Sequence, residues 1–123
     1  MTDSVFEKLG GDEAVSVAVD LFYGKVLADE RIKHFFTGVD MSQQKAHMKR
    51  FMKYAFGGST NYSGKSLRDA HKHLVEEMDL SDKHFDAVLE NLGSTLKDIG
   101  VDDALIAEAA QIVESTRSDV LNK

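Results

Sequence analysis

Histidine is the residue type in this chain best suited to metal chemistry, because five histidines occur and cysteine is absent. Without cysteine there is neither a thiolate ligand nor a disulfide, so any site for a soft metal must use imidazole. His47 and His71 fall on apolar stripes of two different predicted helices. A core histidine satisfied by hydrogen bonds is the ordinary alternative for either residue alone. The presence of two such residues weakens this alternative without excluding it.

The kind of metal site follows from ligand number and spacing. A zinc site needs three or four ligands in a pattern such as H-E-x-x-H, and the chain has no such pattern. His71 and His73 lie about 200° apart around a helix, so they cannot both face one ion. Haem needs only one imidazole and a flat slot of apolar side chains, although an aromatic stripe is more often ordinary core. The candidates for such a slot are Phe22, Phe35, Phe36, Phe51, Tyr54, Phe56, Leu74 and Val88.

The elements that must position these side chains are helices. Proline is absent, so glycine marks the joints between elements. Gly10-Gly11 precedes a predicted helix of about 15 residues with apolar positions from 15 to 26. A second helix is predicted to begin at Asp40, whose carboxylate can accept free amide protons, and to end at Gly57-Gly58. Its predicted buried stripe is Gln44, His47, Met48, Phe51 and Ala55.

Three more helices are expected in the second half of the chain. Residues 57–66 carry turn formers, which predicts a loop, and a capping box then predicts a helix from Ser66. Its apolar face is Leu67, Ala70, His71, Leu74 and Val75. Periodic residues predict helices over 85–99, ended by Gly100, and over 102–113, capped by Asp102. No stretch alternates with period two, so we predict an all-α fold and a single domain over 1–123.

Charge and hydropathy exclude some partners. The net charge of −6, with 21 acidic residues, argues against a broad basic face for nucleic acid or an anionic membrane. The local cluster Lys45, Lys49, Arg50 and Lys53 is interpreted as the solvated side of a helix. No run of about 18 apolar residues occurs, and the N-terminus lacks a signal-peptide pattern. We therefore expect a cytoplasmic protein without nucleic-acid or membrane partners.

Several segments resemble a known family in order and spacing. They are FEKLGGDEAV, DLFYGKVLADERIKHFF, DMSQQKAHMKRFMKYAFGG, YSGKSLRDAH, HFDAV and DVLN. Together they resemble the group 1 truncated haemoglobins of cyanobacterial type over nearly the whole chain. The resemblance implies a truncated globin fold, a two-over-two helical sandwich around haem, with double glycines where helices end.

The resemblance also assigns roles to residues. His71, in RDAH, matches the iron ligand of the family, and His47 matches the histidine that binds the iron when no ligand is present. Tyr23, in LFYGKVL, matches the tyrosine whose hydroxyl points at the ligand, and Gln44 matches the distal polar position. The further haem contacts implied by the resemblance and the helical faces are Phe22, Phe35, Phe36, Met48, Phe51, Tyr54, Leu67 and Leu74.

The chain departs from the family pattern at three positions. Met48 stands where many relatives carry glutamine, so a second distal amide is missing, and Leu67 replaces a methionine found in several relatives. Thr116 occupies the place of a histidine that in some relatives bonds covalently to a haem vinyl group. No histidine follows His84 and no cysteine is present, so we expect non-covalent haem b.

The resemblance implies a haem protein that reversibly binds O2, NO and CO, with two histidines on the iron in the unliganded state. Three alternatives remain open: an NO dioxygenase, a haem protein for electron transfer or redox sensing, and an interaction module without haem. The dioxygenase needs an external reductase, because no flavin or nicotinamide motif occurs. We expect a monomer.

Overall fold

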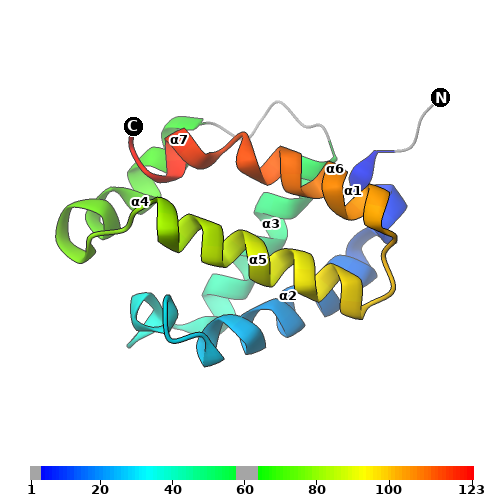
Figure 1. Cartoon of the computed structure of the whole chain (residues 1–123), viewed down its shortest axis with the longest axis horizontal. Helices are drawn as coiled ribbons and strands as arrows, with labels where there is room; N and C mark the ends of the chain where they lie inside the picture. The colour runs from blue at the N-terminus through cyan, green and yellow to red at the C-terminus, as the bar shows by residue number, and fades with distance from the viewer. Residues whose placement is uncertain (1–3, 58–63) are drawn as a thin grey trace.

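A computed structural model describes residues 4–57 and 64–123, and every regular element in this part of the chain is a helix (Figure 1). The elements are α1 (Val5–Leu9), α2 (Gly11–Ala28), the 3₁₀ helix η1 (Lys33–Phe36), α3 (Met41–Phe56), α4 (Gly64–Met78), α5 (Asp82–Asp98), α6 (Asp103–Glu114) and α7 (Arg117–Val120). None of these helices is both long enough and apolar enough to span a membrane.

Two helix pairs form the layers of the fold. Figure 1 shows α5 and α6 side by side in front, with α2 and α3 behind them, and α2 packs against both α3 and α5. The side chains between the layers are apolar and almost completely buried, which supplies the main driving force for folding. They include Val19, Val26, Ile32, Met52, Phe56, Leu92 and Leu96. The predicted all-α sandwich of two helix pairs is confirmed.

The predicted helix starts at Asp40 and Asp102 are confirmed. The Asp40 carboxylate accepts hydrogen bonds from the amides of Ser42 at 3.0 Å and Gln43 at 3.4 Å. The Asp102 carboxylate accepts from the Leu105 amide at 2.8 Å. Each bond satisfies an amide that has no partner inside its own helix. These caps could be predicted because they involve only neighbouring residues.

Glycine is required at two helix joints for different physical reasons. Gly10 joins α1 to α2 with φ of 116°, in the left-handed region, where a side chain would be strained. Gly57 follows α3 with an ordinary φ of −82°, but a Cβ there would lie 2.5 Å from the Lys53 carbonyl oxygen. Gly57 therefore allows a close backbone contact and does not serve to reverse the chain.

Some predicted boundaries are wrong. Helix α4 begins at Gly64 and not at Ser66, so the last part of the predicted 57–66 loop is helical. A capping-box pattern permits a start but does not prevent the helix from extending upstream through a good helix former such as Lys65. Residues 58–63 of that loop lie outside the described part. The short helices α1, η1 and α7 were not predicted, because helices of four or five residues depend on tertiary packing.

Candidate functional site

Helix α4 presents the His71 imidazole in a defined tautomer. The Nδ1 atom of His71 lies 2.8 Å from the carbonyl oxygen of Leu67, one turn earlier in the helix. A carbonyl oxygen can only accept, so Nδ1 carries the proton and the lone pair is on Nε2. Leu67 is buried and Leu74 half-buried, so the apolar face of α4 carries the ring away from water. The imidazole is therefore oriented by its own helix.

The protonation state of His71 suits metal binding. Burial lowers the pKa of the imidazole, and the neighbouring His73 lowers it too, whereas the hydrogen bond to Leu67 raises it. The net direction is downward, which favours the neutral ring at neutral pH. A neutral imidazole with a protonated Nδ1 is the form that binds iron through Nε2.

Tyr23 and Gln44 form a polar pair between α2 and α3. Gln44 donates from its amide to the Tyr23 hydroxyl at 3.0 Å, although Tyr23 is only 3% exposed. Burial raises the pKa of Tyr23, so the hydroxyl keeps its proton at neutral pH. The rings of Phe22 and Phe36 pack edge-on against the Tyr23 ring, with distances between ring centres of 5.0 and 5.7 Å. The hydroxyl is thus fixed by packing and retains a proton to donate.

His47 does not lie where the sequence predicted. The predicted buried stripe of α3 included His47, but its side chain is exposed, whereas Gln44, Met48 and Phe51 are half-buried. At about 100° per residue, the half-buried residues of this stripe span about 60°, and His47 lies about 40° beyond them. No hydrogen bond or ion pair holds the His47 ring among the described residues. His47 therefore stands at the solvent edge of the half-buried face.

The predicted apolar slot is divided between core and half-buried residues. Phe22, Phe35 and Leu67 are buried. The centre of the Phe35 ring lies 4.9 Å from the centre of the His84 ring. The sequence had assigned no role to His84. Buried His84 accepts the Ser81 amide proton at 3.0 Å, so it caps α5. A second set of side chains packs on the core with one side and keeps another side accessible. This set is Phe36, Met48, Phe51, Leu74, Met78 and Val88. Tyr54 is also half-buried.

These residues fit a haem group. A flat apolar cofactor needs a neutral imidazole and accessible apolar surface, and η1, α3, α4 and α5 supply both. A three-ligand metal site is not present in residues 4–57 and 64–123, where no three His, Cys, Asp or Glu side chains come together. Haem requires one oriented, neutral imidazole, and the His71 ring meets that requirement.

A surface groove lies apart from these residues. Its volume is about 420 Å³ and its lining comes from α2 and α3: Ser16, Asp20, Ser42, Lys45, Ala46 and Lys49. Lys45 and Asp20 form an ion pair across it at 3.3 Å. Such a lining does not suit a flat apolar cofactor, and no predicted site residue belongs to it. Lys49 is exposed, as predicted, whereas Lys45 is half-buried.

Comparisons with known proteins agree with this geometry. Residues 4–122 match the family described as bacterial-like globin. The chain is 53% identical over 122 residues to the group 1 truncated haemoglobin GlbN of Synechocystis, covering 98% of both chains. It is 50% identical over 120 residues to the group 1 truncated haemoglobin of Tetrahymena pyriformis, covering 98% of this chain and 96% of the relative.

Solved structures of truncated haemoglobins have a similar fold. The 2/2 haemoglobin of Synechococcus, solved in the cyanomet state with covalently attached haem, superposes with a TM-score of 0.91 at 53% identity. That comparison covers 98% of this chain and 99% of the other. The Fe(III) form of the Tetrahymena pyriformis protein gives a TM-score of 0.87 at 50% identity, covering 98% of this chain and all of the other.

Proposed function

Since this chain belongs to the bacterial-like globin family and to its group 1 truncated haemoglobins, which bind haem and gaseous ligands, we propose that it reversibly binds O2, NO and CO with His71 as the iron ligand. The observation that carries the proposal is the His71 imidazole, whose Nδ1 is bonded to Leu67 and whose Nε2 has its lone pair available. When bound, haem b would supply an iron atom that can take a diatomic ligand, and His71 would hold that iron.

Tyr23 and Gln44 are proposed to tune the affinity for O2. The Tyr23 hydroxyl already accepts from Gln44, so its own proton can be donated to a ligand that carries partial negative charge. Because the ring is held between Phe22 and Phe36, little conformational entropy is lost when that bond forms. Met48 offers no amide here, so this pair supplies the distal hydrogen bonds in our proposal.

His47 is proposed as the internal sixth ligand in the unliganded protein. Its support is the resemblance together with its place one turn after Gln44 on α3. Its ring is exposed and held by no hydrogen bond among the described residues, so it can turn without breaking other contacts. An internal ligand of this kind competes with external ligands and lowers their apparent affinity.

Replacement of His47 by leucine tests the proposal. We expect the wild-type protein with haem to show low-spin spectra in both oxidation states. We expect His47→Leu to become high-spin in the ferric form and five-coordinate in the ferrous form, with faster CO binding because the competitor is removed. The exposed His73→Leu is the matched control and should keep the low-spin spectra. Absence of a Soret band in the wild type would refute haem binding, whereas unchanged spectra in His47→Leu would refute only the sixth ligand.

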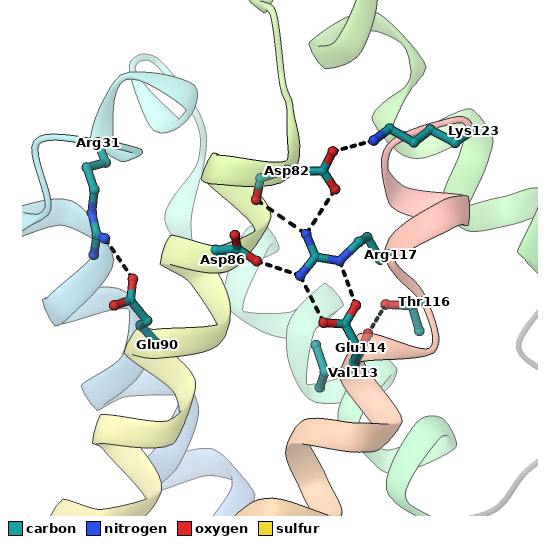
Figure 2. A network of polar contacts seen from close by, with 9 residues as sticks. All are labelled: Arg31, Asp82, Asp86, Glu90, Val113, Glu114, Thr116, Arg117 and Lys123. Atoms are coloured by element: carbon teal, nitrogen blue, oxygen red, sulfur yellow. Dashed lines mark hydrogen bonds and ion pairs between the residues drawn. The ribbon is translucent and has the colours of Figure 1, made fainter.

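Haem is proposed to stay non-covalent in this chain, unlike in the Synechococcus structure. Thr116 is half-buried, and its hydroxyl donates to the Val113 carbonyl at 2.6 Å (Figure 2). A hydroxyl is a much weaker nucleophile than a neutral imidazole, and no cysteine is available.

Acidified butanone should therefore extract the haem after reduction with dithionite, leaving protein of the apoprotein mass. Thr116→His is the matched variant, and it should gain the mass of one haem under the same treatment. A wild-type peak heavier by one haem would show that another side chain forms the bond.

Oxidation of NO by O2 is a second candidate function. The Tyr23–Gln44 pair favours it, because hydrogen bonds that retain O2 give NO time to react with it. Repeated turnover would require an external reductase, since the chain has no flavin or nicotinamide motif.

A further inference from the structure

The helix that carries His71 packs chiefly against the end of the chain. Helix α4 makes its main interhelical contact with α7, a single turn of four residues (Figure 1). We call residues 117–123, which comprise α7 and the three residues after it, the C-terminal clasp. The position of α4 therefore depends more on the clasp than on any other helix among the described elements.

Within the part of the chain that the structure describes, the hydrogen bonds between the clasp and α4 all involve Arg68. The Arg68 Nε donates to an Asp119 carboxylate oxygen at 2.9 Å, and its terminal nitrogen donates to the Lys123 carbonyl at 2.7 Å. In the opposite direction, the Asn122 amide donates to the Arg68 carbonyl at 3.1 Å. Both the side chain and the backbone of Arg68 are therefore fixed by the clasp.

The clasp is anchored in turn by Arg117. Its guanidinium donates to Asp82 at 3.0 Å, to Glu114 at 2.6 and 2.9 Å, and to Asp86 (Figure 2). The guanidinium carbon also lies 4.5 Å from the centre of the Phe85 ring, and Lys123 forms an ion pair with Asp82. Arg117 thus joins the clasp to the start of α5 and the end of α6.

The contacts continue from Arg68 to the imidazole of His71. Leu67, which precedes Arg68, is buried, and its carbonyl orients the His71 ring through Nδ1. A shift of the 67–68 turn against α5 and α6 would move both the acceptor and the helix that carries the ring. Loss of a group that orients a metal ligand typically lowers the affinity for the metal by about 10- to 100-fold.

We propose that the C-terminal clasp is a positioning element that fixes the 67–68 turn and thereby sets the position and orientation of the His71 imidazole towards haem. This inference rests on the proposed role of His71 as the iron ligand. It assigns a function to Arg68, Arg117 and Asn122 that nothing in their local sequence indicates.

Two clasp variants test the proposal. Asn122→Gly removes the amide and keeps the left-handed backbone, since Asn122 has φ of 58° and glycine accepts that region. Arg68→Met removes the guanidinium and keeps much of the apolar stem. The matched control is Arg31→Met, which breaks the exposed ion pair between Arg31 and Glu90 in the middle of α5 (Figure 2). It also removes the ion pair between Arg31 and Asp29. All three variants are measured as holoproteins.

The first measurement is the iron–histidine stretching band in resonance Raman spectra, recorded immediately after photolysis of the CO complex. We expect both clasp variants to shift or broaden this band, whereas Arg31→Met leaves it unchanged. The second is haem transfer to excess apomyoglobin, which we expect to accelerate about tenfold in the clasp variants. Arg68→Lys, which restores the charge opposite Asp119, should recover part of both effects.

The outcomes separate this inference from the proposed function. No iron–histidine band in the wild type would refute His71 as the ligand. A normal wild-type band with an unchanged band and haem transfer rate in both clasp variants would overturn the positioning role. A shift of equal size in Arg31→Met would also overturn it, because the effect would then follow from any lost ion pair.

Discussion

Replacing His71 with alanine is expected to give a folded protein that loses haem during purification. The His71 imidazole is the only protein group that we assign to permanent contact with the iron, and its Nε2 is prepared for it by the Nδ1 bond to Leu67. Loss of a residue that merely orients a metal ligand costs about 10–100-fold in affinity, so loss of the ligand itself should cost at least about 100-fold.

The measurement is the haem-to-protein ratio and the Soret spectrum of protein purified without imidazole. His73→Ala is the matched control, because His73 is exposed on the same helix and about 200° away around it. Added free imidazole should partly restore haem binding to His71→Ala. A variant with normal haem content and an unchanged spectrum would show that another side chain holds the iron.

Tyr23→Phe is expected to speed O2 dissociation by about 10- to 100-fold. This range corresponds to the roughly 1.5–3 kcal/mol contributed by a hydrogen bond to a charged partner. The substitution keeps the ring that packs against Phe22 and Phe36 and removes only the hydroxyl bonded to Gln44. Since burial raises the pKa of Tyr23, the hydroxyl is protonated throughout the neutral range and the wild-type rate should not depend on pH there.

Stopped-flow or flash-photolysis rates for O2 and CO distinguish a hydrogen bond from a packing effect. CO carries less negative charge than O2 when bound, so its dissociation should change much less. Equal acceleration of both ligands would contradict the proposed donor role of Tyr23 and indicate a change in the shape of the pocket.

The sequence predicts best what depends on neighbouring residues. The caps at Asp40 and Asp102 and the apolar face of α2 follow from local spacing. The stripe predicted for α3 missed its two buried residues, Met52 and Phe56. The prediction that His47 belongs to the buried stripe was wrong. Helical periodicity locates the boundary of a buried face only to within about 100°, the rotation per residue, and His47 lies at that boundary. For such a residue, tertiary packing decides between burial and exposure.

The contacts of the C-terminal clasp could not be predicted from spacing. Arg68 and Asp119 are 51 residues apart, and Arg117 and Asp82 are 35 apart. Short polar stretches such as TRSD carry no periodic signal, and a helix of four residues is stable only through the packing that surrounds it. The His71 iron ligand was predicted from family resemblance, whereas the hydrogen bond that sets its tautomer required the structure.

The acceptor on His71 also bears on the reduction potential of the haem. A carboxylate hydrogen-bonded to Nδ1 would draw the proton towards itself and give the ring anionic character, which stabilises the ferric state. The Leu67 carbonyl is uncharged, so the imidazole remains a neutral and weaker electron donor. The potential is then higher than a carboxylate partner would allow. With His71 on the iron as proposed, a backbone atom of α4 would favour the ferrous state, the oxidation state in which O2 and CO bind.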